Sequence, residues 1–586
     1  MIPMYEEEKT SEMKQSRFNL KVLISTLTAT IITAVLCIAS KKLYNREPDS
    51  LSLLRELYDD KNNICPVTEK MIPSKSEQFS ELDYFRTSKY KNHSVEVWGN
   101  AVRIPSMTYD NYPENGDDHK FDIFYKMESF IKKSFPHIIS KSELIHINTH
   151  ALIFIIHGEN KELKPILLTA HQDVVPVPPE TVLRWKYPPF EGHFDGQYLW
   201  GRGAADDKDH FISMMEAVDH LLSQGFTPKR TIIIGLGFDE EIEGTRGAKL
   251  INAYLLKRYG KDSIFFISDE GGMGVQDMYG ARLALPSTGE KGYIDITIEL
   301  ATTGGHASIP PRHTAIGIMS ELATLIESKP YELRLTTKNP FYVQLQCMAT
   351  KGKDMDPLLR NSIRGMDYSP RAKKMVLDTL DKDIMTRYLV STSQAIDIFD
   401  AGIKINALPE KVIMKINHRV GYDSSLEEVK QTVLENAKII AKKYELAIND
   451  YDSIKSSGFS DIPIGEFTLS TDVNLVPAPK SPASGDSWNI FAGSLKYIYE
   501  DFAIYPDADP SIGKEVTVAP SVMSANTDTK YFWNLTDNIY RFSPFRGQCS
   551  KNWHAIDERV DLDSHIESVA FFYTLLRNVE EYDSNF

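Results

Sequence analysis

The sequence predicts an α/β fold whose sheet is mostly parallel, because strand-like and helix-like patterns alternate along the chain. Four short apolar runs are typical of buried strands: residues 151–158, 165–170, 231–238 and 263–268. Three stretches have the apolar spacing of amphipathic helices: residues 121–135, 207–225 and 247–260. Strands that alternate with helices favour parallel pairing, with helices packed on the sheet faces.

Length and charge narrow the class of protein. A chain of 586 residues is too long for one simple core, so we expect two or more domains. The net charge of −15 argues against a general nucleic-acid binder, which would carry a basic face. Four cysteines without a CxxC spacing are too few for a disulfide framework and do not suggest a cysteine-based zinc site.

The N-terminal region predicts a membrane anchor. Residues 22–40 form a run of 19 without a charge, flanked by Lys21 and by Lys41 and Lys42. This length fits one transmembrane helix better than a cleaved signal peptide or a buried core helix. The flanking charges do not fix its orientation. Two N-glycosylation tripeptides, at Asn92 and Asn534, follow the run and favour a lumenal body.

Three predicted strands are each followed by polar residues that could bind a metal. His171 and Asp173 follow the second strand, Glu240 and Glu241 the third, and the pair Asp269-Glu270 the fourth. In open α/β sheets, ligands bind outside the carboxyl ends of the strands. Each pattern alone is more often a polar loop or a helix cap, but together they predict one shared site.

An acidic pair at the start of the next helix, Asp206-Asp207, adds to the carboxylates expected there. Clustered carboxylates repel one another unless a positive charge neutralises them. An imidazole with several carboxylates and no thiolate suits Zn²⁺, Mn²⁺ or Co²⁺. The sequence therefore predicts a divalent metal site.

Six motifs in order resemble the di-zinc peptidases of the M20 family. They are "AHQDVVPV", "WGRGAADDK", "GFDEEIEGTRGA", "ISDEGG", "GGHASIPP" and "HAIDERVD". Within the family the resemblance is nearest to the vacuolar Gly-X carboxypeptidases of yeasts, and it runs from about residue 50 to the C-terminus. It implies a peptidase that releases the C-terminal residue of short peptides, anchored in the vacuole membrane by one span with its catalytic body in the lumen.

The resemblance also implies roles for individual residues and two Zn²⁺ ions per subunit. The implied metal ligands are His171, Asp206, Glu241, Asp269 and His554, with Asp206 bridging both ions. Glu270 is an alternative to Asp269. The implied catalytic residues are Asp173, which orients His171, Glu240 as general base and His306, which stabilises the oxyanion from the lid. Asn406 and Arg419 resemble positions near the substrate carboxylate; for Arg419, an ion pair on a sheet face is an equally good explanation.

The expected domain order follows from the motifs and from the patterns between them. Alternating apolar residues, such as Ile294, Ile296 and Ile298, begin a two-layer α+β lid inserted in the catalytic domain. We expect a cytosolic tail (1–21), the membrane anchor (22–40), a stalk with the first helices (41–110), a first catalytic segment (111–289), the lid (290–478) and a second catalytic segment (479–586). In many members of the family that this chain resembles the lid mediates dimerisation, so the resemblance implies a homodimer through the lid, which here has extra sequence near 335–400.

Two other functions compete with a carboxypeptidase. An N-acyl-amino-acid hydrolase or synthase of the same family would use the same catalytic residues and differ only in its pocket. A non-catalytic, membrane-anchored binding protein would have lost a ligand or the base, yet His171, Asp206, Glu240, Glu241 and His554 are all present. The second alternative is therefore disfavoured.

Overall fold

The computed structural model describes residues 64–451, 464–506, 510–547 and 549–585. The chain divides into two units, Met1–Ile64 and Cys65–Phe586, and every helix and strand of the described residues belongs to the second. The predicted cytosolic tail and membrane anchor lie outside the described residues. Within the described ranges, no helix combines the length and the apolar character that crossing a bilayer requires.

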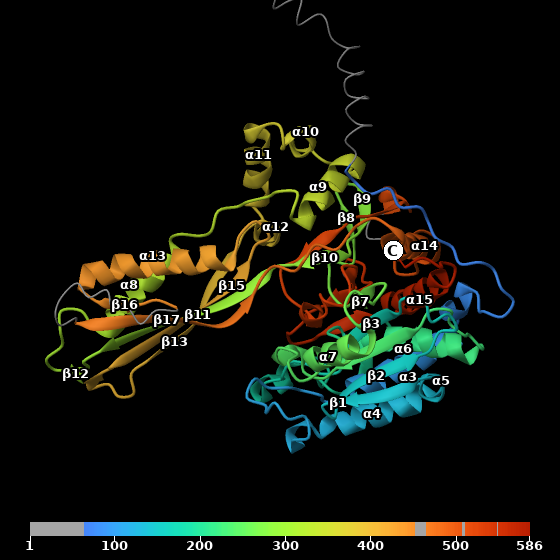
Figure 1. Cartoon of the computed structure of the whole chain (residues 1–586), viewed down its shortest axis with the longest axis horizontal. Coiled ribbons are helices and arrows are strands. Elements are labelled where there is room, and N and C mark those ends of the chain that lie inside the picture. The colour runs from blue at the N-terminus through green and yellow to red at the C-terminus, as the bar shows by residue number, and fades with distance from the viewer. Residues whose placement is uncertain (1–63, 452–463, 507–509, 548, 586) are drawn as a thin grey trace, which may run out of the picture. The chain divides into compact units, whose positions relative to one another are not determined.

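An eight-stranded sheet forms the centre of the larger α/β body (Figure 1). Its order is β1 (Glu143–Ile147), β2 (Ala151–Ile156), β6 (Ile232–Gly237), β3 (Ile166–His171), β7 (Ile267–Asp269), β20 (Ile539–Arg541), β10 (Ser287–Glu290) and β19 (Ser521–Met523). The central strands β6, β3, β7 and β20 pair in parallel, as the sequence predicts. The edge strands β1 and β2 are antiparallel to each other, and β2 is antiparallel to β6.

The mixed edge has a local cause that the apolar pattern does not show. Asn148 and Thr149 both have positive φ and make the short turn between β1 and β2. A connection this short can only join antiparallel neighbours, because parallel strands need a long crossover. The prediction of a mostly parallel sheet therefore holds for the centre, whereas the whole sheet is mixed, because β1–β2, β2–β6 and β20–β10 pair antiparallel.

Helices cover the sheet at positions close to those predicted. The helices of this α/β body include α3 (Ser88–Val102), α4 (Ile123–Ser134), α6 (Lys208–Ser223), α7 (Ala248–Tyr259), α14 (Asp486–Tyr497) and α15 (Leu562–Val579). Helix α6 packs against both α3 and α15, and fully buried Trp98 and Phe211 belong to the same core cluster. Gly260, with a φ of 92°, ends α7 as expected from its position.

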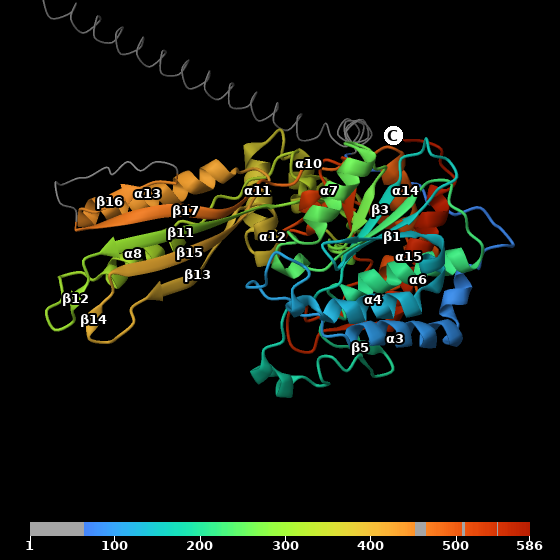
Figure 2. The same cartoon turned by 60° about the horizontal axis from the view of Figure 1, so that its bottom comes forward.

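A two-layer unit occupies the segment predicted to form a lid. Its five-stranded sheet has the order β13 (Ser393–Ala401), β15 (Lys411–Val420), β11 (Gly292–Thr302), β17 (Gly465–Leu475) and β16 (Ala447–Asn449). Residues of β11 alternate between buried and half-buried, and Ile294, Ile296 and Ile298 point into the core of this unit. Helices α8 (Ala315–Glu327) and α13 (Leu426–Tyr444) supply the second layer (Figure 2).

The extra sequence near 335–400 forms a helical segment of four short helices. They are α9 (Pro340–Lys351), α10 (Pro357–Gly365), α11 (Pro370–Leu380) and α12 (Ile384–Leu389). The first three begin in the same way, with Asn339, Asp356 or Ser369 as the N-cap and proline as the next residue. The cap side chain satisfies a free backbone N–H, and proline fits the first helical position, which lacks a hydrogen-bond acceptor.

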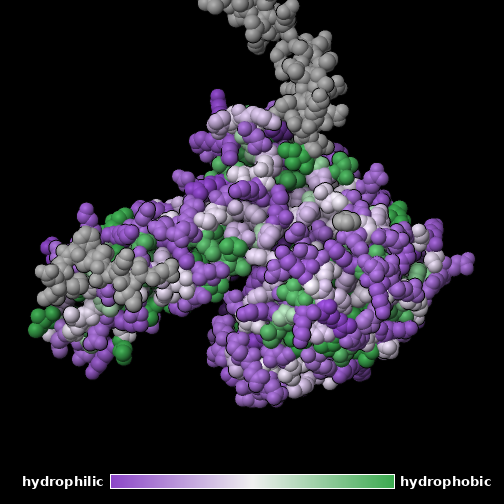
Figure 3. All heavy atoms as spheres, viewed as in Figure 1, coloured by the Kyte–Doolittle hydropathy of each residue, from purple (hydrophilic) through white to green (hydrophobic). Residues whose placement is uncertain are grey.

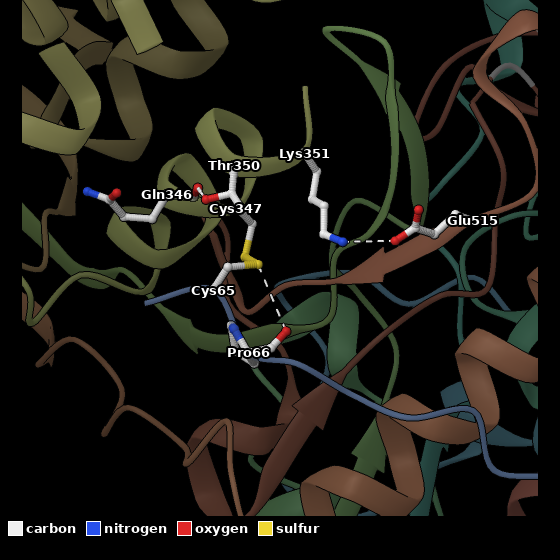
Figure 4. Close-up of a disulfide and its surroundings, with 7 residues drawn as sticks. All are labelled: Cys65, Pro66, Gln346, Cys347, Thr350, Lys351 and Glu515. Atoms are coloured by element: carbon white, nitrogen blue, oxygen red, sulfur yellow. Dashed lines mark hydrogen bonds and ion pairs between the residues drawn. A yellow bond between two sulfur atoms is a disulfide. The ribbon is translucent and has the colours of Figure 1, made fainter. Parts of the chain in front are cut away.

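A disulfide joins Cys65 to Cys347 on α9 (Figure 4). It links residues 282 positions apart and ties the start of the second unit to the helical segment. The cysteine count led us to expect no disulfide framework, and this single bond was not foreseen, because sequence spacing alone does not pair two distant cysteines. Disulfides persist in oxidising compartments, so the bond is consistent with a lumenal protein.

We expect removal of this disulfide to destabilise the fold. The double variant Cys65→Ser/Cys347→Ser should lower the free energy of unfolding by about 2–4 kcal/mol, because the reduced chain regains conformational freedom when unfolded. Urea unfolding followed by circular dichroism measures the change. Wild-type protein unfolded in the presence of a reductant should match the variant, and equal midpoints for oxidised and reduced protein would contradict the prediction.

Candidate metal centre

Three neighbouring parallel strands bring acidic and imidazole side chains to one edge of the sheet. His171 is the last residue of β3. Glu240 and Glu241 begin the 3-10 helix η4 (Glu240–Ile242) after β6, and Glu270 directly follows β7. Because β6, β3 and β7 are adjacent and parallel, their carboxyl ends lie side by side. The sequence prediction of one shared site at this edge agrees with the geometry.

Asp206 lies between the two imidazoles. Its Oδ1 is 3.2 Å from His171 Nε2, and its Oδ2 is 3.0 Å from His554 Nε2. A second carboxylate accompanies each imidazole: Glu270 Oε1 lies 3.3 Å from His171 Nε2, and Glu241 Oε1 lies 3.4 Å from His554 Nε2. The cluster thus has two halves that share Asp206.

Asp173 holds both His171 and the turn that bears Glu240. The backbone carbonyl of Asp173 lies 3.0 Å from His171 Nδ1, and its Oδ1 lies 3.3 Å from the same nitrogen. The carboxylate also accepts the backbone N–H groups of Glu240 and Glu241, at 3.1 and 3.2 Å, and the hydroxyl of Thr108 at 2.8 Å. With Nδ1 engaged in this way, Nε2 of His171 is directed into the cluster.

Glu558 fixes the loop that carries Asp206, a role that the sequence analysis missed. Its Oε1 accepts the backbone N–H groups of Ala205 and Asp206 at 2.8 and 3.2 Å. Its Oε2 accepts a hydrogen bond of 2.5 Å from buried Arg202. In the sequence, Glu558 is visible only as the acidic residue four positions after His554 in "HAIDER". Its contact with the backbone of residues 205–206 depends on the fold.

The structure separates the two acidic residues of "DEGG". Glu270 contacts His171, and a carboxylate oxygen of Glu270 lies within 4.8 Å of ligand atoms of His171 and Asp207. Asp269 ends β7, and among the described residues its buried Oδ2 has no hydrogen-bond partner and no ion pair with either imidazole. The geometry therefore favours Glu270, the alternative left open by the sequence, over Asp269 as the residue facing the cluster.

Burial and crowding hold several of these acids in their protonated forms when no cation is bound. Burial, with repulsion from Asp206, raises the pKa of Glu270 to about 8 and that of Glu241 to about 7. Burial likewise raises the pKa of Glu240 well above its usual value. Hydrogen bonds to Asp206 and Glu241 raise the pKa of His554 to about 10.

The residues of the cluster fit divalent metal ions. Potential ligand atoms of His171, Asp206 and Glu241 lie within 4.8 Å of one another, and so do those of His171, Asp207 and Glu270. Glu241 Oε1 is buried and makes no hydrogen bond. Nitrogen and carboxylate ligands without sulfur suit Zn²⁺, Mn²⁺ or Co²⁺, and a cation would relieve the repulsion that raises the carboxyl pKa values.

The three predicted residues of the lid segment lie in two places. Arg419, near the end of β15, donates to Asn526 Oδ1 at 2.9 Å and stacks over Tyr293, 4.5 Å from the ring centroid. His306 lies on the short strand β12 (Gly305–His306), which pairs with β14 (Ala407–Leu408).

Asn406, which precedes β14, accepts the backbone N–H of Ala307 and so lies beside His306. Both side chains are exposed. Among the described residues, neither side chain is hydrogen-bonded or ion-paired to the cluster or to Arg419. The structure therefore does not group Asn406 with Arg419 within one chain.

Comparisons with known proteins agree with this geometry. Residues 167–578 match the model of peptidase family M20/M25/M40. Carboxypeptidase S of Saccharomyces cerevisiae is 39% identical over 525 residues, which cover 88% of this chain and 89% of the relative. The N-fatty-acyl-amino acid synthase/hydrolase of Mus musculus is 27% identical, over 83% of this chain and 88% of that protein. Human carnosine dipeptidase 1 shares the fold, with a TM-score of 0.57, 13% identity and coverage of 86% of this chain and 98% of that one.

We expect the metal-free protein to lose stability as the pH rises from about 5 to 9. Glu241, Glu270 and His554 bind protons more tightly when folded. Each contributes stability that is fully present below its unfolded pKa (4.5 for the glutamates, 6.5 for the histidine) and is lost as the pH rises through its folded pKa, about 7, 8 and 10 respectively. Thermal unfolding of chelator-treated protein at several pH values measures the loss.

Added Zn²⁺ supplies the control for this prediction. It should raise the Tm of the chelated protein, and more at pH 8 than at pH 6, because the ligands must lose their protons to bind metal. In Glu270→Gln, the Tm of the chelated protein should depend less on pH and should rise less when Zn²⁺ is added. A chelated protein that becomes more stable as the pH rises over this range would count against the proposed site.

Proposed function

The chain belongs to peptidase family M20/M25/M40, and from that premise we propose that it is a carboxypeptidase that uses two zinc ions to release the C-terminal residue of short peptides. The family is metal-dependent and hydrolyses peptide bonds. The observation that carries the proposal is the position of Asp206 between His171 and His554, with one further carboxylate beside each imidazole. These residues could hold two divalent metal ions, which would supply Lewis-acid chemistry at the site.

We assign one metal to His171, Asp206 and Glu270, and the other to His554, Asp206 and Glu241. This assignment replaces Asp269 with Glu270, because Glu270 Oε1 lies 3.3 Å from His171 Nε2, whereas Asp269 makes no ion pair with His171 among the described residues. Bound at these residues, the ions would acidify a water molecule and polarise the scissile carbonyl. Asp173 and Glu558 act as positioning residues, since their hydrogen bonds fix His171, the Glu240 turn and the Asp206 loop.

Glu240 is the proposed general base. It lies half-buried beside the cluster, on the turn held by Asp173, and the positive charge of bound metal would favour its ionised form. Ionised Glu240 takes a proton from the attacking water and returns it to the leaving amine, so the peptide bond breaks without a covalent intermediate. The hydrogen bonds from the turn to Asp173 keep the base in place for both transfers.

Arg419 is the proposed partner of the substrate's terminal carboxylate. Asn526 and the Tyr293 ring hold the guanidinium in one orientation. A planar guanidinium can donate two parallel hydrogen bonds to a carboxylate, which suits recognition of a free C-terminus.

An N-acyl-amino-acid hydrolase or synthase is the second candidate. A cavity of about 810 Å³ with a mostly apolar lining includes Arg419 among its lining residues. That volume is larger than one amino-acid side chain needs and favours a substrate with a bulky apolar group. The two candidates share every catalytic residue and differ in what occupies this cavity.

A lumenal location on the vacuole membrane belongs to the proposal as well. The uncharged run 22–40 supports a single membrane span, and the Cys65–Cys347 disulfide supports an oxidising compartment. Asn92 and Asn534, the asparagines of the two glycosylation tripeptides, are both exposed. Modification of these residues in the lumen would be compatible with the fold.

A homodimer through the two-layer unit is the proposed assembly. Its edge strand β13 is exposed, and large apolar side chains, Ile309, Ile403 and Ile405, are at least 83% exposed near β12 and β14. Exposed His306 and Asn406 belong to the same end of this unit. A subunit that docked through this surface could bring His306 to the metal centre of its partner, where an imidazole could stabilise the oxyanion.

Replacing Glu240 tests the mechanism. Glu240→Gln should lower kcat for glycyl-leucine about 10²–10⁴-fold, because the proton transfers lose their base, while the metal content stays unchanged. Steady-state kinetics and metal analysis of the same preparation measure both. Glu243→Gln is the matched control, since Glu243 is an exposed acid on the same turn. Full activity in Glu240→Gln would exclude the proposed base.

Replacing Arg419 tests substrate recognition. Arg419→Ala should lower kcat/KM for dipeptides about 10–100-fold, mainly through a higher KM, because a charged hydrogen-bond pair with the carboxylate is lost. Lys415→Ala, on the same strand β15, is the control. A fall in kcat with an unchanged KM would show that Arg419 does not hold the substrate carboxylate.

A further inference from the structure

The helical segment encloses a large apolar cavity of about 810 Å³. Its walls come from α9, α10, α11, α12 and β13, together with residues near β8 (Val275–Met278) and β19. Six representative lining residues are Met273, Leu345, Met348, Leu380, Leu389 and Met523. Unbranched and γ-branched side chains of this kind make an adaptable apolar surface.

The cavity lining includes residues that are close in sequence to the proposed metal ligands. Trp553, which lines it, precedes the ligand His554, and Gly272, which also lines it, is two residues after Glu270. Arg419 and Lys291 belong to the lining and are its basic residues. A substrate whose amide lies at the metals and whose carboxylate meets Arg419 would therefore present its remaining groups to this opening.

Several fixed contacts hold the cavity open. Buried Lys291 donates to the carbonyls of Tyr388 and Ser391, at 3.0 and 2.8 Å. Asn339 donates to the carbonyl of Leu389 at 2.9 Å, and the disulfide fastens α9 through Cys347. The walls are thus tied to one another and to the segment before β11, so a ligand would meet a largely preformed pocket.

The outer rim of the cavity is also apolar. Ile384 and Met385 on α12 line it and are each 68% exposed, and Ala395 on β13 lines it from the side of the two-layer unit. Figure 3 shows hydrophobic side chains gathered where the two-layer unit meets the helical segment. The opening therefore offers an apolar path from solvent to the interior.

We propose that the helical segment is a specificity module whose cavity binds a large apolar group of the substrate, carried on an amide beside a free carboxylate. The proposal rests on the hydrolytic function proposed above and adds a substrate class to it. Two portions of a substrate share this chemistry: the acyl portion on the carbonyl side of the scissile bond, and the side chain of the released residue. Each methylene buried in the cavity should improve kcat/KM roughly fourfold until the cavity is filled.

Two substrate series distinguish these portions. In the first, glycine is kept as the released residue, and the N-acyl group grows from acetyl to octanoyl to palmitoyl. In the second, glycine is kept on the carbonyl side, and the released residue grows from alanine to leucine to tryptophan. The series whose kcat/KM rises with size identifies the portion that enters the cavity, whereas two flat series would overturn the proposal.

Variants that narrow the cavity test whether the dependence of kcat/KM on substrate size arises there. Thr379→Trp on α11 and Ala395→Trp on β13 add an indole from two independent walls, at positions that are not fully buried. Each should lower kcat/KM at least tenfold for the largest substrate of the rising series and less than twofold for the smallest. Leu358→Trp, on the outer surface of α10 where Leu358 is 60% exposed, is the matched control and should change neither.

A binding measurement separates this proposal from the catalytic one. The fluorescent probe 11-(dansylamino)undecanoic acid, which joins a carboxylate to an alkyl chain, should bind chelator-treated protein with a blue-shifted emission. Thr379→Trp and Ala395→Trp should weaken its Kd at least tenfold. Unchanged binding in both variants would overturn the cavity assignment, whereas probe binding without hydrolysis of any substrate by the metal-loaded protein would instead overturn the proposed function.

Discussion

The crowding of buried acids around two imidazoles is the constraint on which the rest of the site depends. Asp206, Glu241 and Glu270 lie within 3.4 Å of His171 or His554, and burial raises the carboxyl pKa values of the two glutamates. Such a cluster is stable at neutral pH only with protons or with cations. Divalent metal ions satisfy this requirement and at the same time supply the chemistry of peptide hydrolysis, so one electrostatic need accounts for both structure and function.

The central sheet and the loops after its strands bring these acids and imidazoles together and hold them there. Parallel neighbours β6, β3 and β7 end at the same edge, so residues far apart in sequence reach one point. Asp173 and Glu558 then accept the backbone N–H groups of the turns that bear Glu240 and Asp206. Without either acid, the side chains proposed to bind the metals would lose the hydrogen bonds that orient them, and we expect weaker metal binding and disturbed catalytic geometry.

The helical segment differs from the charged cluster, because its interior is apolar. Contacts at the ends of its helices hold its shape. The disulfide at Cys347, the hydrogen bonds of Lys291 and the cap residues of three short helices hold the cavity open. The proposed catalytic residues do not themselves distinguish among amide substrates. In our proposal this cavity makes the selection, because buried apolar area discriminates substrates by size.

The sequence by itself determined the central strands, the amphipathic helices and the set of residues that could bind metal, because periodicity and strand ends are local properties. Ile166–His171 and Lys208–Ser223 lie where their patterns predict. Only the tertiary structure favours Glu270 over Asp269, since the direction of a side chain at a strand end depends on the packing around it. It also decided the antiparallel pairing of β2 with β6, the role of Glu558, the separation of Asn406 from Arg419 and the pairing of Cys65 with Cys347. Each of these depends on which distant segments meet in space, and no local pattern records that.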